Sequence, residues 1–184
     1  MGRHDEMSAV PVQRRLEKTM KLLTALLALT MTTALWAAPT NVAYDTHDGY
    51  FVSNKFEPKE PTSFVVLQHQ KAFDNVFGVA FVMRDKAHRL PKGAFAKNIV
   101  VAAIHRGKAL VDFKVECVRL DGKSLLVRYI TKSQSIATAE YACPLIVSLP
   151  KGDYRAVQFT EDGKDVTRIE VAPPLASPAA KPER

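Results

Sequence analysis

The stretch ALVDFKVECVRLDGKSLLVRYITK, residues 109–132, decides the fold, because it holds two alternating apolar and polar runs around Asp121-Gly122. An Asp-Gly pair between two such runs is a strong signal for a β-hairpin. The alternation predicts an antiparallel pair of strands with one buried face and one solvated face. The residues expected on the buried face are Val111, Phe113, Val115 and Cys117 in the first run, and Leu125, Val127 and Tyr129 in the second.

Further segments carry the same kind of signal. Strands are expected over residues 63–69, 98–105, 140–149, 154–160 and 164–171, the last two joined across Glu161-Asp162-Gly163. Residues 98–105 are apolar on both faces, which indicates a central strand covered from both sides. One short helix is expected near residues 71–77, where apolar residues recur at helical spacing. The sum predicts an all-β fold, a mainly antiparallel sandwich or open barrel with one or two short helices.

The chain begins with a segment typical of an export leader. An apolar run follows Lys21 and ends in small residues before Pro39, so residues 1–37 are interpreted as a signal peptide cleaved near Ala37 or Ala38. The alternative is an uncleaved membrane anchor, because 17 residues is the lower limit for a span. Residues 1–19 are unusually long and acidic for a leader, and Met20 is an alternative start. The expected location is periplasmic or secreted.

The rest of the chain divides by composition. Residues 38–62 are polar and broken by prolines, residues 63–171 form the predicted β domain, and residues 172–184 form a disordered Ala/Pro tail. Removing residues 1–37 lowers the formal charge from +7 to +5. This modest positive charge is dispersed along the strands, and it favours no nucleic-acid partner. No second stretch is apolar enough to span a membrane.

Two cysteines, Cys117 and Cys143, remain after the leader. In an oxidising compartment two thiols on inward faces favour a disulfide, which would stabilise the fold by about 3 to 3.5 kcal/mol in the chain-entropy model. The alternative is a pair of buried free thiols that act as small hydrophobic side chains.

A search for catalytic motifs finds none. The sequence has no G-x-S-x-G, S-x-x-K or P-loop motif, and its histidines are not spaced as in zinc enzymes. The crowding of Asp45, His47 and Asp48 makes them weak candidates for a divalent-cation site, although such segments are usually solvated loops. No metal, cofactor or catalytic residue is therefore assigned.

The densest positive interval is a possible interaction surface. It lies within residues 84–97 and comprises Arg84, Lys86, His88, Arg89, Lys92 and Lys97. It would hold a small ligand or an anionic polymer, or serve only as a solvated surface. The polar segment 133–138 is the second candidate surface, because binding residues are common on loops.

The order of elements over residues 63–171 resembles the exported domain of the protease complex subunit PrcB family. The resemblance rests on Phe73, Val76 and Phe77 in the short helix, on Phe95–Lys97, on Ile99–Ile104, on Pro144–Val147, and on Val157 and Phe159. The Gly-Gly-Tyr stretch of that family is absent here, where residues 106–112 are RGKALVD. The resemblance implies a non-catalytic accessory domain that associates with a cell-envelope protease.

Three functional hypotheses follow, and they are given in the order in which the sequence favours them. The first is an exported, non-catalytic β interaction module, an accessory subunit of a cell-envelope protease or a similar complex, whose partner is another envelope protein. The second is a protein that binds a small ligand or a polyanion through the basic interval 84–97. The third is a hydrolase whose paired carboxylates meet only in the folded chain.

Overall fold

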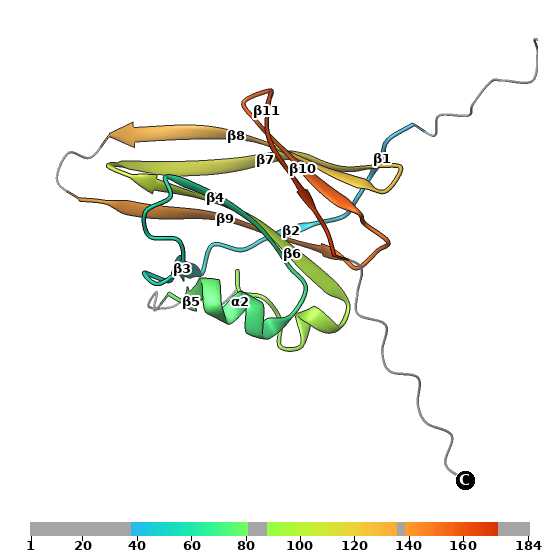
Figure 1. Ribbon diagram of the computed structural model, residues 1–184, viewed down its shortest axis with the longest axis horizontal. Coiled ribbons are helices and arrows are strands. Elements are labelled where there is room, and N and C mark those ends of the chain that lie inside the picture. Colours follow the sequence, from blue (N-terminus) through green and yellow to red (C-terminus); the bar gives the residue numbers. More distant parts are fainter. Residues whose placement is uncertain (1–37, 81–87, 136–138, 173–184) are drawn as a thin grey trace, which may run out of the picture. The chain divides into compact units, whose positions relative to one another are not determined.

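A computed structural model describes residues 38–80, 88–135 and 139–172. Two β-sheets form the main layers (Figure 1). The five-stranded sheet has the order β1-β7-β8-β10-β11, with β1 at Thr40–Asn41, β7 at Ala109–Asp121, β8 at Ser124–Ser135, β10 at Ala156–Glu161 and β11 at Lys164–Glu170. The four-stranded sheet has the order β2-β9-β6-β4, with β2 at Asp45–Thr46, β9 at Tyr141–Pro150, β6 at Asn98–Gly107 and β4 at Thr62–Leu67. The predicted all-β class is confirmed.

The opening hairpin is β7 and β8, and its turn lies one residue later than expected. Asp121 pairs with Ser124, so the two loop residues are Gly122 and Lys123. Gly122 has a φ of 58°, a conformation that glycine adopts without steric cost. The second predicted hairpin, β10 and β11, is also present, and its loop residues Asp162 and Gly163 both have positive φ. Both hairpins therefore close with two-residue loops, but only the second uses the expected Asp-Gly pair.

A β-bulge in β7 changes which side chains face inward. Val115 pairs with Tyr129, whereas Cys117 pairs with Arg128, which leaves one extra residue between them. Beyond this bulge Val118 is buried against the core. The expectation that Cys117 faces inward is wrong, because the extra residue reverses the alternation and places Cys117 on the outer face beside Arg128.

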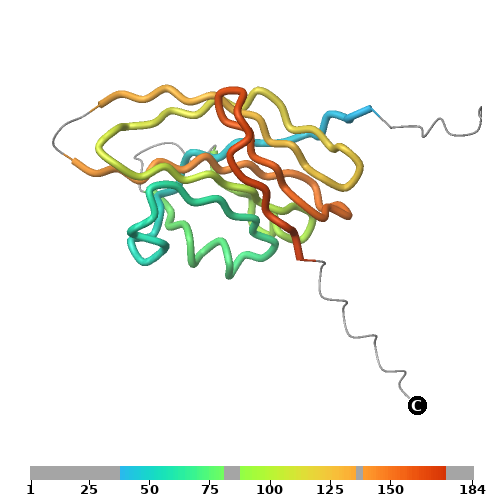
Figure 2. Tube along the Cα trace, turned by 45° about the horizontal axis from the view of Figure 1, so that its top comes forward, coloured from blue at the N-terminus to red at the C-terminus, as the bar shows by residue number. Residues whose placement is uncertain are grey.

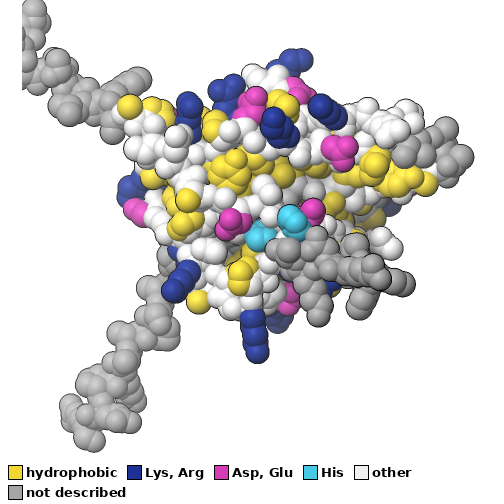
Figure 3. Space-filling view, turned by 180° about the vertical axis from the view of Figure 1, so that it is seen from behind, with side chains coloured by type: hydrophobic (Ala, Val, Ile, Leu, Met, Phe, Trp, Pro, Cys, Tyr) yellow, Lys and Arg dark blue, Asp and Glu magenta, His cyan; other side chains and the backbone are white. Residues whose placement is uncertain are grey.

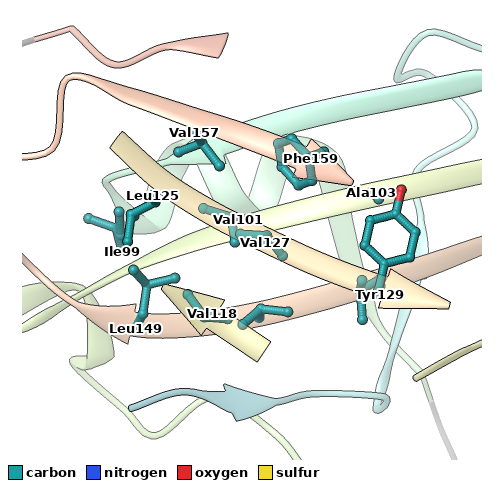
Figure 4. Packing of buried hydrophobic residues seen from close by; sticks show 12 residues of the cluster. Ile99, Val101, Ala103, Val118, Leu125, Val127, Tyr129, Leu149, Val157 and Phe159 are labelled. Atoms are coloured by element: carbon teal, nitrogen blue, oxygen red, sulfur yellow. The ribbon is translucent and has the colours of Figure 1, made fainter. Parts of the chain in front are cut away.

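The core between the two sheets consists of alternate residues from β6, β7, β8, β9 and β10 (Figure 4). Leu125, Val127 and Tyr129 of β8 are all fully buried there, as the alternation predicted. One pair within the five-stranded sheet is parallel, namely β8 with β10, and the other pairs of that sheet are antiparallel.

The four-stranded sheet is covered on its second face as well. A layer comprising α2 (Gln70–Val76), the β3–β5 ribbon (Tyr50–Val52 and Phe77–Val79) and the 3-10 helix η1 (Ala94–Ala96) packs there (Figure 1). Alternate residues of β6 enter the two cores, Val101 on one side and Val100 on the other. This confirms that residues 98–105 form a central strand covered on both sides. The predicted helix is confirmed, with its first residue at Gln70.

The segment predicted to be irregular adds strands to both sheets. The β1 strand pairs with β7, and β2 pairs with β9 (Figure 2). The N–H of Val42 donates to the Val118 carbonyl at 2.9 Å, and the N–H of His47 donates to the Ile146 carbonyl at 3.0 Å. Residues 42–47 therefore cross from one sheet to the other at the same edge of the sandwich.

Candidate functional site

A groove of about 510 Å³ lies between β7 on one side and the β2 and β9 strands on the other. Three pieces of the chain line it: residue 44 with residues 46–48, residues 111–115 of β7, and residues 144–146 of β9. On the face seen in Figure 3, a band of apolar side chains runs beside two histidines and several acidic groups. The lining of the groove itself combines apolar residues with the charged residues Asp48, Asp112 and Lys114.

The groove runs along an edge of β7 that has no hydrogen-bonded strand partner among the described residues, although β9 approaches this edge at Cys143, whose Sγ contacts the Val111 N–H. Among the described residues, the other neighbour of β7 besides β8 is β1, and it pairs only with Arg119 and Leu120. The stretch before Val118 therefore has no strand paired with it on that side. We call residues 110–116 of β7 the open edge.

The backbone of the open edge offers hydrogen-bonding groups to the groove. The N–H of Val111 points away from β8, because it donates to Sγ of Cys143 in β9 at 3.3 Å. Peptide groups alternate in direction along a strand, so those of Phe113 and Val115 point to the same side as that of Val111. Those of Asp112 and Lys114 point to β8. Phe113 and Val115 thus present N–H and C=O groups that a further strand would pair.

The side chains of the open edge divide between the two faces of the sheet. Phe113 is anchored inside the sandwich, where its ring contacts His105 at a centroid distance of 5.3 Å and Tyr129 at 5.8 Å. Asp112 and Lys114 are exposed. A strand added here would therefore meet a fixed apolar inner face and a charged outer face.

The opposite wall of the groove has a strand edge with few donors. Pro144 of β9 has no N–H, which suits a position at the edge of a sheet. The carbonyl of Ile146 is already paired with the His47 N–H. The peptide groups of β7 are therefore the better docking edge.

His47 is buried at the margin of the groove with both ring nitrogens engaged. Its Nδ1 lies 3.2 Å from the His88 carbonyl, and its Nε2 lies 2.8 Å from Oγ of Ser148. A carbonyl only accepts, so Nδ1 carries the hydrogen and Nε2 accepts from the Ser148 hydroxyl. Burial lowers the pKa of His47, although the His88 carbonyl and the nearby Asp45 and Asp48 act in the opposite direction.

The weak cation candidates do not converge on one point. The ring of His47 is taken by the bonds just described, and a carboxylate oxygen of Asp48 lies 3.8 Å from Nδ1 of His88. Over residues 38–80, 88–135 and 139–172, no group of three metal-ligating side chains comes together. Asp45, His47 and Asp48 therefore do not form a ligand set among the described residues.

The basic interval is only partly within the described residues, and Arg84 and Lys86 lie outside them. Of the remainder, Arg89 donates from Nη2 to the Ala80 carbonyl at 2.7 Å, so its guanidinium holds the local chain. Lys92 and Lys97 are exposed. The second predicted surface is not a loop throughout, because residues 133–135 continue β8, and residues 136–138 lie outside the description.

The predicted disulfide is wrong, because Cys117 and Cys143 are both free. Sγ of Cys143 lies against the N–H of Val111, whereas Cys117 is six residues farther along β7. At about 3.3 Å a residue this separates the two cysteines by roughly 20 Å. A disulfide requires Cα atoms within about 7 Å, so the bond does not fit this arrangement.

A polar cluster ties the two sheets together at one end of the core. Oε2 of Glu161 in β10 lies 3.1 Å from Nε2 of His105 in β6, and it accepts a hydrogen bond from the Tyr129 hydroxyl at 3.1 Å. Tyr129 is fully buried, and burial, with Glu161 nearby, raises its pKa far above the usual range. A buried phenol that stays protonated and donates to Glu161 suits a structural contact between the sheets.

Comparison with protein-family models, with curated proteins and with solved structures finds no match to this chain. Among the described residues, none of the helices has the length and apolar character needed to cross a membrane. The open edge and its groove were missed by sequence reasoning, which assigned residues 109–132 a structural role only, as a β-hairpin with one buried face. The available signal was the outward charge pattern of Asp112, Lys114 and Glu116 on a long strand.

Proposed function

We propose that this protein is an exported, non-catalytic interaction module that binds an extended polypeptide segment by strand addition to the open edge of β7. The observation that supports this most is the direction of the Phe113 and Val115 peptide groups, which alternation places away from β8, where no strand pairs with them among the described residues and a groove of about 510 Å³ begins. Added strands gain affinity from main-chain hydrogen bonds and specificity from alternate side chains.

A cell-envelope role remains part of this proposal. The leader-like residues 1–37 favour export, and the resemblance to the PrcB family favours an accessory subunit of an envelope protease or a similar complex. In such a complex the added strand belongs to a second polypeptide chain. The alternative of a ligand or polyanion site in the basic interval is less favoured, because Arg89 is engaged by the Ala80 carbonyl.

Photo-crosslinking in intact cells tests the proposal. A photoreactive amino acid replaces Glu116, an exposed residue at the open edge, and the matched control probe replaces Glu170, which is exposed on β11 at the other edge of the same sheet. The Glu116 probe is expected to give an adduct of discrete mass that maps to one segment of a second polypeptide. The Glu170 probe is expected to give none.

Two valine substitutions provide the second part of the crosslinking experiment. Val115→Lys places a charge in the groove at the open edge, where Val115 is half-buried against the core, and Val166→Lys places one at an exposed position of the β11 edge strand, so thermal melts must first show that both variants remain folded. The adduct should disappear with Val115→Lys and persist with Val166→Lys. Identical adducts from both probes, or an adduct unaffected by Val115→Lys, would rule out strand addition at this edge.

A further inference from the structure

The open edge has a charge pattern that is complementary to itself. Asp112 and Lys114 flank Phe113, and both side chains are exposed on the outer face. If a second β7 strand runs antiparallel to the first with Phe113 opposite Phe113, then Asp112 of each copy lies opposite Lys114 of the other. Val111 likewise lies opposite Val115, which puts apolar side chains together on the inner face.

The direction of the peptide groups agrees with this register. Phe113 presents its N–H and C=O outward, so the Phe113 pair exchanges both hydrogen bonds. Asp112 and Lys114 then form non-hydrogen-bonded pairs, in which the Cβ atoms of opposite residues lie about 5 Å apart. This spacing is well suited to two symmetric ion pairs.

Neighbouring registers are less favourable. A centre on Lys114 places Lys114 opposite its own copy and Asp112 opposite Glu116, and a centre on Asp112 also sets like charges together. A centre on Val115 pairs Lys114 with Glu116, but it places Asp112 opposite Val118. The Val118 carbonyl is already bonded to the Val42 N–H at 2.9 Å. The register centred on Phe113 is therefore selected by charge and by available space.

The length of the open edge also fits an antiparallel pair of β7 strands centred on Phe113. On one side it ends at Val118, where β1 begins to pair, and on the other side β7 itself begins at Ala109. With Phe113 at the centre, Leu110 pairs with Glu116, so the paired residues span 110–116 and leave β1 in place. The weak acceptor Sγ of Cys143 gives up the Val111 N–H to a carbonyl of the second copy.

We propose that the strand taken up by the open edge is β7 of a second copy of this chain, in a two-fold symmetric dimer centred on Phe113. This inference rests on the proposed strand addition and names its partner. The contact is isologous, so one interface closes the assembly. It also covers the one long stretch of β7 that would otherwise invite uncontrolled pairing.

Charge reversal tests the dimer, because two single substitutions should weaken it and their combination should restore it. Asp112→Lys sets Lys opposite Lys114, Lys114→Asp sets Asp opposite Asp112, and the double variant restores opposite charges with reversed sign. Sedimentation equilibrium of the exported protein, purified without its leader, should give a dimer for the original sequence. Each single variant should raise the dimer dissociation constant about tenfold, and the double variant should return it to within about threefold. Thermal melts of each variant check that the monomer remains folded.

Residue-resolved amide exchange supplies the second measurement. The amides of Phe113 and Val115 should exchange slowly at dimer-forming concentrations and quickly on dilution, whereas those of Asp112 and Lys114 remain protected by β8 throughout. A monomer at every concentration, or a dimer indifferent to the charge reversals, would overturn the dimer. If Glu116 crosslinks only to a different protein, strand addition stands and the dimer falls. If Glu116 gives no adduct sensitive to Val115→Lys, strand addition itself fails.

Discussion

The hydroxyl of Tyr129 donates a hydrogen bond to Oε2 of Glu161 from a fully buried position. Replacing Tyr129 by Phe leaves a carboxylate with one donor fewer at a site largely closed to water. The free energy of unfolding should fall by about 1 to 3 kcal/mol, because hydrogen bonds to charged groups in such places are costly to lose. Urea denaturation measures the change.

The control for this variant is Tyr154→Phe, whose hydroxyl donates to the Pro150 carbonyl at 2.9 Å in an exposed setting. Water can replace that bond, so the loss should be smaller, about 0.5 kcal/mol. Equal losses for the two variants would show that the buried contact with Glu161 carries no special weight.

Stability should decrease with acid because of His47. Burial lowers the pKa of His47 in the folded protein below its ordinary value of 6.5. The unfolded chain therefore binds a proton first, so the contribution of neutral His47 is fully present above about pH 6.5 and is lost as the pH falls through the folded pKa. Denaturation midpoints measured between pH 8 and pH 5 should fall accordingly.

His47→Gln removes the titrating group and keeps a side chain that can both donate and accept. Its midpoint should fall less steeply over the same pH interval. The matched variant His69→Gln leaves the Ser148 contact intact and should keep the original slope. An unchanged slope in His47→Gln would contradict the assignment to this side chain.

Both cysteines should be free thiols in the isolated protein. Unfolding without a reductant, followed by alkylation, should add two alkyl groups, and reduction should leave the melting temperature unchanged. The physical reason is the separation of roughly 20 Å along β7. An intact mass two hydrogens lower, with no alkylation, would contradict this arrangement.

Gly78 should be intolerant of a side chain while Phe51 is present. A Cβ built at Gly78 would lie 2.3 Å from Cζ of the Phe51 ring, so that ring must move. Gly78→Ala should cost about 1 kcal/mol in the original protein and much less in a Phe51→Leu background, as a double-mutant cycle would measure. Equal costs in both backgrounds would indicate that the ring contact is not responsible.

Local alternation predicted much of the scaffold. The inward set of β8, the two-sided burial of β6 and the short helix all follow from apolar spacing, because burial on one face or two leaves a direct trace in residue type. The Asp162-Gly163 turn could be predicted because a two-residue hairpin loop requires positive φ values, which Asp and Gly adopt more readily than most residues.

The bulge and the open edge could not be predicted in the same way. Alternation continues through Cys117 in the sequence, and only the pairing with β8 shows that one residue is left over. A shared inward pattern also gives no information on distance along a strand, which is why the cysteine pairing failed. The two-residue strands β1 and β2 have too few residues for any period, so the place where β7 loses its neighbour was hidden.

The parallel pairing of β8 with β10 has a consequence for the order of folding. The chain leaves β8, passes through β9 in the other sheet, and only then returns to lay β10 beside β8. The β10–β11 hairpin is a local element, whereas its pairing with β8 closes a loop that contains the whole of β9. Because β8 and β10 are far apart in the sequence, the loop closure that brings them together slows the formation of this pair. A newly synthesised chain must therefore protect two flanks of the hairpin that begins at Ala109, and one of them is covered only when the C-terminal strands arrive.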